Sequence, residues 1–166
     1  EQQAEQQGGG RELVVVSAAG KTTNRLIQLV ELAEAGDEAA GEAITALHAY
    51  QQSLIDGLLE GELLLDLSQQ LTDDMQQIAK TLEGQFDRFE RNGLLAFGEV
   101  WSARLLAALL TSRGDKAIWL DARSFLRAED GALVKVDTAL SSELLKARLA
   151  EHAGRIVVTG FIAADM

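Results

Sequence analysis

Three short stretches of the sequence combine small, hydroxyl and acidic residues in a way that suits the binding of a small charged molecule. They are "SAAGKTTN" (17–24), "FGEVWSARLL" (97–106) and "VVTGF" (157–161). The first follows an apolar run and opens a helical pattern, and a helix N-terminus offers unpaired N–H groups and partial positive charge to a carboxylate or phosphate. The second carries Glu99, whose carboxylate suits an ammonium group. The third ends an apolar run in Thr159, Gly160 and Phe161, and the glycine there suits either a ligand close to the backbone or a turn.

The Gly-Lys-Thr triplet at 20–22 is not a P-loop for nucleotide phosphates. That motif requires a glycine five residues before the glycine of the triplet, so that a long loop can wrap the phosphates. The position is occupied by Val15, a β-branched residue inside an apolar run. We therefore expect Val15 in a strand, and the loop at 17–21 to be too short for a phosphate cradle of that type.

Each candidate residue also has a structural role open to it. Thr22 or Thr23 would serve equally well as the N-cap of the following helix. Glu99 would lie in the first turn of a helix starting at 99, where it would complement the helix dipole. Ser102 could approach the same site or fill a packing position. Asp121 and Arg123 in "WLDARSF" are expected to form a salt bridge or a cap.

The composition excludes several classes of protein. The 166 residues are 47% hydrophobic, which is enough to bury a core, and carry a net charge of −11, which disfavours nucleic acid and anionic membrane surfaces as partners. The absence of cysteine excludes disulfides and thiolate chemistry, and two histidines are too few to suggest a metal centre. No signal peptide or long apolar run is evident, so we expect a cytoplasmic location.

The pattern of the chain predicts an α/β fold with a mainly parallel sheet. Near-continuous apolar runs predict strands covered on both faces, at residues 12–17, 116–122 and 155–161. Helical patterns separate them, at residues 23–35, 37–59, 61–83, 85–93, 99–113 and 141–152. The region 37–92 is a predicted helical insertion, with leucines such as Leu58, Leu59, Leu63 and Leu71 at helical spacing. Packing with a solvated acidic face is its simplest interpretation, and a partner-binding surface is the alternative.

Taken together, the motifs resemble those of the amino acid kinase family, and specifically of aspartate kinases. "VVVSAAGKTTNRL" is similar to the strand-loop-helix signature of that family, "GEVWSARLL" to its Gly-Glu-x-x-Ser-Ala helix, and "VVTGFIA" to its Thr-Gly-Phe strand end. With "WLDARSFLRAE", the resemblance is strongest to the kinase part of bifunctional aspartokinase/homoserine dehydrogenases, especially the methionine-branch type. It covers residues 12–163, and the helical insertion is the least diagnostic part.

The resemblance implies a three-layer αβα fold of the carbamate kinase-like type, and phosphorylation of the side-chain carboxylate of L-aspartate by Mg-ATP for lysine, threonine and methionine synthesis. The hydroxyl residues of the first motif would hold the substrate carboxylates, the glutamate its α-amino group, and the third motif would line the site. By motif match these residues are Ser17, Thr23, Glu99, Thr159, Gly160 and Phe161. Lys21 departs from relatives that carry glycine, and no catalytic role is expected for it.

Two further family motifs are not found in the sequence. They are a Lys-Phe-Gly-Gly strand, whose lysine neutralises the transferring phosphate, and a downstream Gly-Arg-Gly-Gly-Ser-Asp loop. We therefore expect these residues to be part of a larger, homo-oligomeric enzyme and to be inactive alone, with ATP and Mg²⁺ as cofactors, and NADP if a dehydrogenase domain follows. A glutamate-type or acetylglutamate-type kinase, and a non-catalytic interaction domain built on the helices of the insertion, are the alternatives.

Overall fold

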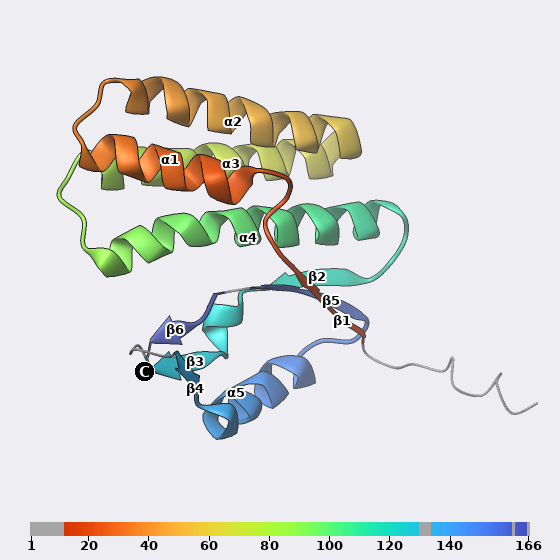
Figure 1. The fold of residues 1–166 in the computed structure, drawn as a ribbon. Helices are drawn as coiled ribbons and strands as arrows, with labels where there is room; N and C mark the ends of the chain where they lie inside the picture. Colours follow the sequence, from red (N-terminus) through yellow and green to blue (C-terminus); the bar gives the residue numbers. More distant parts are fainter. Residues whose placement is uncertain (1–11, 130–133, 161, 166) are drawn as a thin grey trace, which may run out of the picture.

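The computed structural model describes residues 12–129, 134–160 and 162–165. Its main sheet is parallel and has the order β1 (Glu12–Val16), β5 (Arg155–Thr159) and β2 (Ala117–Leu120). Helices α1 (Thr22–Glu34), α2 (Ala39–Leu58), α3 (Gly61–Leu82) and α4 (Arg88–Ser112) lie on one side of this sheet, and α5 (Thr138–Ala150) lies on the other (Figure 1). The prediction of a three-layer αβα fold is therefore confirmed.

The central strand β5 is covered on both faces, as its apolar run predicts. Val157 packs towards α4, with Ala103 and Ala107, whereas Ile156 and Val158 pack in the cluster that includes the leucines of α5. Every residue from Ile156 to Thr159 is buried. The strand thus contributes to two apolar clusters, one on each face of the sheet.

The edge strand β1 departs from the prediction of burial on both faces. Leu13 and Val15 pair in register with Ile156 and Val158, so their side chains face the α5 side of the sheet. They are nevertheless 40% and 67% exposed, because the leucines of α5 pack over β5 and β2 and not over β1. An apolar run alone does not show where a covering helix ends.

Helix α4 is one continuous helix of 25 residues, and the predicted division into helices at 85–93 and 99–113 is wrong. A capping box between Asp87 and Glu90 starts it, and it runs through Gly98 without a break. Glycine in a helix interior costs about 1 kcal/mol relative to alanine, but at this position it allows the loop after β1 to pack closely. By length and composition α4 could also cross a membrane, although it lies between the sheet and the other helices (Figure 1).

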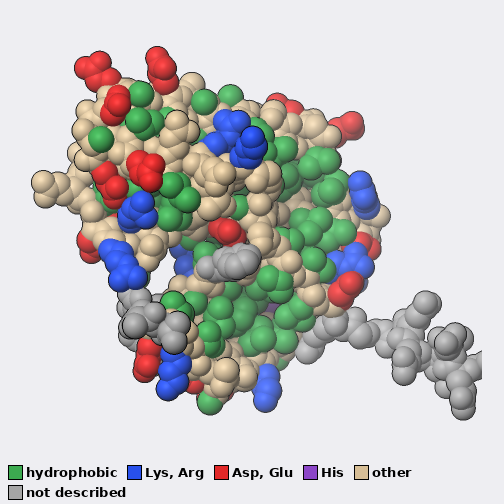
Figure 2. All heavy atoms as spheres, in the orientation of Figure 1, with side chains coloured by type: hydrophobic (Ala, Val, Ile, Leu, Met, Phe, Trp, Pro, Cys, Tyr) green, Lys and Arg blue, Asp and Glu red, His purple; other side chains and the backbone are tan. Residues whose placement is uncertain are grey.

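The second and third helices differ in position: α3 packs on α4 beside α1, and α2 forms an outer layer over α1 and α3 (Figure 1). Their buried side chains belong to one cluster with those of α1 and α4: Leu26, Leu29, Val30, Leu47, Ile55, Leu59, Leu67, Leu71, Met75, Ile78, Leu94, Trp101 and Leu105. This supports the packing interpretation of the leucine pattern, although Leu58 is 45% exposed. Acidic side chains spread over the outer surface of the helical layer, and apolar ones gather nearer the strands (Figure 2).

A second, smaller sheet was not predicted. It has the order β4 (Lys135–Val136), β3 (Arg127–Glu129) and β6 (Ala164–Asp165), and it follows the short 3-10 helix η2 (Ala122–Ser124). Strands of two or three residues are too short to show a period of two in the sequence. The Asp121 side chain caps η2 and pairs with the Arg123 guanidinium at 2.6 Å, which confirms the predicted salt bridge or cap.

Candidate functional site

The carboxyl ends of β1 and β5 lie side by side. Val16 pairs with Thr159, and the N–H of Gly160 donates to the carbonyl of Val16 at 2.7 Å. A Cβ on Gly160 would lie 2.9 Å from that same carbonyl oxygen, so the glycine permits the close approach of the two backbones. In parallel sheets this edge is where ligands bind, because the loops that leave the strands lead into helix N-termini.

The loop between β1 and α1 is short, as expected from Val15, which lies within β1. This confirms that the Gly-Lys-Thr triplet is not part of a P-loop. Gly20 has a φ of +56°, a conformation that favours glycine. Thr22 Oγ1 donates to the carbonyl of Ala19 at 2.7 Å, inside the turn that the loop makes before the helix.

Capping of α1 by Thr22 or Thr23, one of the two roles left open by the sequence, is excluded. The N-cap residue is Lys21, and no side chain caps the helix. Thr22 is fully buried and points back to the loop, whereas Thr23 is half-buried in the first turn. No capping hydroxyl therefore accepts from the N–H groups of this turn. The N–H of Thr22 donates to the carbonyl of Ala19, and the amides that follow it in the turn are suited to a carboxylate.

The carboxylate of Glu99 lies against this loop. Glu99 is in the middle of α4 and only 7% exposed, so the predicted position in a first helical turn is wrong and the helix dipole does not account for it. Burial raises the pKa of Glu99 above its ordinary value of 4.5, although hydrogen bonds from the N–H groups of Glu99 and Ala18 oppose this in part. Among the described residues, no Lys, Arg or His forms an ion pair with it.

Gly98 explains how α4 and the loop come so close. A Cβ at this position would be 2.9 Å from the Cβ of Ala18 and 3.4 Å from Cγ2 of Thr22. Three residues after Glu99, and on the same side of the helix, the Oγ of Ser102 is buried and has no hydrogen-bond partner in the described part of the chain. A buried hydroxyl of this kind requires a partner, which a ligand or water would supply.

Thr159 completes the arrangement from β5. Its side chain is 2% exposed, and its Oγ1 accepts a hydrogen bond from the N–H of Ala122 at 2.8 Å. The hydroxyl hydrogen can still donate to a second acceptor. Ser17 is exposed at the end of β1, while Phe161 lies outside the described residues. The structure thus brings the ends of β1 and β5, the start of α1 and the middle of α4 to one place.

Sequence reasoning missed three residues that shape this site. Thr22 was considered as a cap or as a ligand-binding hydroxyl, but not as the partner of a distant helix. Tyr50 and Gln51 on α2 were not singled out, although Gln51 Nε2 donates to Thr22 Oγ1 at 2.7 Å. A tyrosine and a glutamine in a Gln-rich and Glu-rich helical region give no signal, because the sequence does not show which turn of α2 faces the loop.

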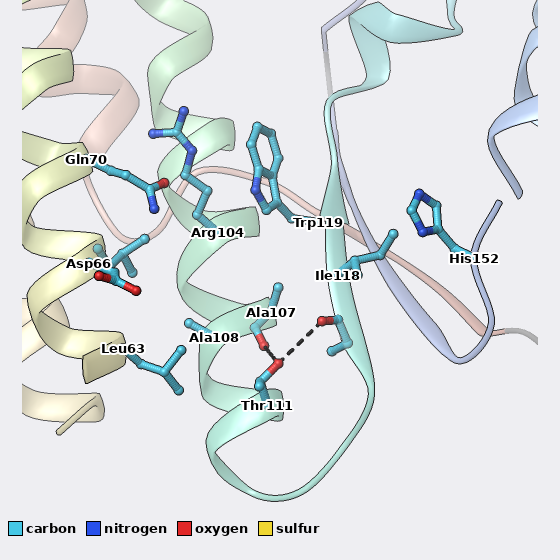
Figure 3. A pocket seen from close by; sticks show the side chains of 12 residues that line it. Leu63, Asp66, Gln70, Arg104, Ala107, Ala108, Thr111, Ile118, Trp119 and His152 are labelled. Atoms are coloured by element: carbon cyan, nitrogen blue, oxygen red, sulfur yellow. Dashed lines mark hydrogen bonds between the residues drawn. The ribbon is translucent and has the colours of Figure 1, made fainter. Parts of the chain in front are cut away.

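A separate groove of about 480 Å³ lies between α3, α4 and β2 (Figure 3). Asp66 and Gln70 line it from α3, Arg104 from α4 and Trp119 from β2. It does not include Glu99 or the loop at 17–21, so it is distinct from the candidate site. No group of three or more His, Cys, Asp or Glu that could hold a metal ion is found among the residues that the structure describes.

Comparison with known proteins gives consistent matches. The model of the amino acid kinase family matches residues 2–166. Bifunctional aspartokinase/homoserine dehydrogenase 2 of Escherichia coli is 42% identical over 153 residues, which cover 92% of this chain and 19% of that protein. The chloroplastic bifunctional aspartokinase/homoserine dehydrogenase 1 of Arabidopsis thaliana is 29% identical over 161 residues, with 92% and 18% covered. This chain thus spans about a fifth of the length of these relatives.

The fold is also found in solved structures. The crystal structure of E. coli aspartokinase III in complex with lysine and aspartate superposes with a TM-score of 0.78 and 26% identity, covering 93% of this chain and 35% of that one. The structure of the same enzyme with aspartate and ADP gives a TM-score of 0.74. The aspartate kinase of Clostridium acetobutylicum, at 17% identity and a TM-score of 0.72, shares the fold.

Proposed function

The chain belongs to the amino acid kinase family, as its motifs predicted, and from that premise we propose that it forms the acceptor-binding part of an aspartate kinase. Such an enzyme transfers a phosphoryl group from ATP to the side-chain carboxylate of L-aspartate. Similar proteins from Escherichia coli and Arabidopsis thaliana are aspartokinases or carry an aspartokinase part, which supports aspartate over glutamate or acetylglutamate as the acceptor.

The observation that carries this proposal is the buried carboxylate of Glu99. An ionised carboxylate taken out of water is costly unless an opposite charge or hydrogen bonds compensate it. Ala18 supplies one N–H, but no cationic side chain of the described residues pairs with Glu99. The α-ammonium of aspartate would supply the missing charge and donate up to three hydrogen bonds, and Ser102 Oγ is a further acceptor on the same side of α4.

The carboxylates of aspartate would face the other side of the site. The first-turn N–H groups of α1 carry partial positive charge, and the hydroxyls of Ser17 and Thr23 flank them. We propose that these groups, with Thr159 and Gly160 beneath them, orient the substrate. Phosphoryl transfer depends mainly on such positioning, because the protein takes little covalent part in it.

The described residues do not match a nucleotide and metal site. The loop at 17–21 lacks the length of a phosphate cradle, and no cluster of metal-ligating side chains is present in the described part. We propose that the described residues contribute the acceptor side of the reaction and that the chain alone is inactive. In the proposed parent enzyme, ATP and Mg²⁺ would be held by other segments. A homo-oligomeric state and an NADP-dependent dehydrogenase part are further proposals, the latter from the bifunctional relatives.

Calorimetric titration of the chain with L-aspartate tests the proposal. We expect saturable binding of L-aspartate, weaker binding of L-glutamate, and no binding of N-acetyl-L-aspartate, which lacks the ammonium group. Glu99→Gln should abolish the difference between aspartate and its N-acetyl derivative, because it removes the charge that recognises the ammonium. Equal affinity for all three ligands in the folded wild-type chain would refute the assignment.

A further inference from the structure

Helix α2 reaches the candidate site through a buried hydrogen-bond chain. Gln51 Nε2 donates to Thr22 Oγ1 at 2.7 Å, and Thr22 Oγ1 donates to the carbonyl of Ala19 at 2.7 Å. The Gln51 and Thr22 side chains are 4% and 0% exposed. A glutamine of the outer helical layer is therefore linked, through one hydroxyl, to the backbone of the loop that holds Glu99.

A second contact lies one residue earlier on α2. A Cβ on Gly20 would collide with the hydroxyl oxygen of Tyr50, so this tyrosine lies directly over the glycine of the loop. The Arg25 guanidinium lies 4.5 Å from the centroid of the Tyr50 ring, and this cation–π contact ties the ring to α1. Tyr50 and Gln51 thus contact the loop at Gly20 and Thr22, on either side of Lys21.

The use of glutamine here is not explained by packing. Burying an amide costs free energy unless it is hydrogen-bonded, and an apolar side chain of similar volume would fill the same space without that cost. What the amide adds is direction, since it fixes the orientation of the Thr22 hydroxyl and, through it, the Ala19 carbonyl. The preceding residue, Ala18, is the one whose N–H reaches the Glu99 carboxylate.

We propose that Gln51, supported by Tyr50, is a positioning residue that holds residues 17–22 in the shape that binds the substrate. The expected consequence is tighter binding of the acceptor, and this part of the inference rests on the proposed function. It assigns α2 a role in substrate recognition, beyond filling the outer helical layer.

The chain offers a matched control for this test. The neighbouring Gln52 also donates an amide hydrogen bond to a hydroxyl, that of Ser68 on α3 at 2.7 Å, in a partly buried position, and the same amide donates to Asp56 Oδ1. Gln51→Met and Gln52→Met therefore each remove an amide-to-hydroxyl hydrogen bond from the same helix with little change in volume, and only the first removes a bond to the loop. Thr22→Val removes the hydroxyl that receives the Gln51 bond, whereas Thr22→Ser retains it.

Backbone amide exchange, measured with the unliganded chain, is the first readout. Because one net hydrogen bond corresponds to a change of about 3- to 10-fold, Gln51→Met and Thr22→Val should speed the exchange of the Ala18 and Thr22 amides by about that factor. Gln52→Met and Thr22→Ser should leave both amides within about 2-fold of wild type, since neither breaks the link to the loop. Similar acceleration in Gln51→Met and Gln52→Met would show general destabilisation and overturn the proposal.

Aspartate titration is the second readout. Gln51→Met and Thr22→Val should each weaken aspartate binding by about 3- to 10-fold, and the double variant should be no weaker than either one, because both remove the same link. Full additivity, or unchanged affinity in Gln51→Met, would contradict a positioning role. If the wild-type chain binds no aspartate, the proposed function fails, while the exchange data still decide whether Gln51 holds the loop.

Discussion

Two buried carboxylates at α4 differ in whether a cationic side chain pairs with them. Asp74, on α3, accepts a hydrogen bond from Trp101 Nε1 at 2.9 Å and an ion pair from Arg104 at 2.5 Å. Glu99, on α4 itself, is equally buried but receives only backbone N–H groups from the described residues. Asp74 is compensated by charge within the protein, whereas Glu99 lacks a cationic partner.

This difference distinguishes Asp74, an acid with a structural role, from Glu99, the acid proposed to bind the ligand. The Asp74 pair joins α3 to α4, and the Arg104 guanidinium continues to the ring of Trp119 on β2, 4.9 Å away. A carboxylate buried without a cation lowers stability, and such strain is found at sites prepared for a ligand. Replacing the acid by its amide should therefore lower stability at Asp74 and lower ligand affinity at Glu99.

Asp74→Asn should have the largest effect on stability. It leaves the Arg104 charge largely buried without its partner, which we expect to lower the free energy of unfolding by about 3 kcal/mol. Urea denaturation measures this change, and Asp73→Asn, at an exposed neighbouring position, should change it by less than about 0.5 kcal/mol. Aspartate affinity, corrected for the folded fraction, should not change. A loss of affinity as large as that of Glu99→Gln would remove the distinction between the two acids.

Glu99→Gln should have the opposite signature. The loss of a charge-assisted interaction with the substrate ammonium should weaken aspartate binding by about 2 kcal/mol, roughly 30-fold. The free energy of unfolding should stay the same or rise, because a buried carboxylate without a cation is removed. Calorimetry and urea denaturation of the same preparation test both parts. A variant that loses stability and keeps its affinity would show Glu99 to be structural, like Asp74.

Gly98→Ala tests the contact that brings Glu99 to the loop. The added Cβ would be 2.9 Å from the Cβ of Ala18, and the overpacking should cost about 1 kcal/mol after the higher helix propensity of alanine is included. Gly93→Ala, on the same helix with no atom within 4 Å, should instead stabilise the protein by about 0.5 to 1 kcal/mol. Thermal unfolding compares the two. Adding Ala18→Gly should restore part of the loss in Gly98→Ala, and a lack of rescue would place the strain elsewhere.

The pH dependence of the wild-type chain should show the smallest effect. Burial raises the pKa of Glu99 in the folded state above its ordinary value of 4.5. At a pH between the ordinary pKa and the raised pKa, the folded state therefore binds more protons than the unfolded state. The contribution of Glu99 to stability therefore falls as pH rises through this interval, and it is absent in Glu99→Gln. Aspartate affinity should rise over the same interval, because the ammonium requires the ionised carboxylate. Denaturation and titration over a pH series give the difference between wild type and variant, and parallel curves would contradict the pKa shift.

Local patterns predicted much of the architecture. The apolar runs located the three parallel strands within one or two residues at each end, and Val15 excluded a P-loop because a β-branched residue in an apolar run belongs to a strand. The division of α4 at Gly98 was wrong, since a glycine that breaks an isolated helix is tolerated where packing requires its small size. Strands β3, β4 and β6 were missed because two or three residues carry no detectable period.

The candidate site was predicted in part for the same reasons. Glu99, Thr159 and Gly160 stood out because each is adjacent to a strand end or to a glycine at a predicted helix start. The structure places Glu99 against the loop that follows β1, and Thr159 and Gly160 beside the end of β1. Capping by Thr22 or Thr23, one of the two roles that the sequence left open, does not occur: the N-cap is Lys21, and the Thr22 hydroxyl donates to the carbonyl of Ala19 and accepts from Gln51. Contacts with a helix far away in the sequence cannot be read from the local spacing of residues.

The sequence by itself determined the three strands of the main sheet, most of the helical segments between them, the family and the identity of the polar residues near the strand ends, because these depend on local periodicity and on short motifs. The tertiary structure alone decided which acid has a cationic partner. Asp74 meets Arg104 across 30 positions of sequence, and Gln51 meets Thr22 across 29. Burial, pairing and pKa depend on what surrounds a side chain in space, and at these sites the surroundings come from helices far apart in the chain.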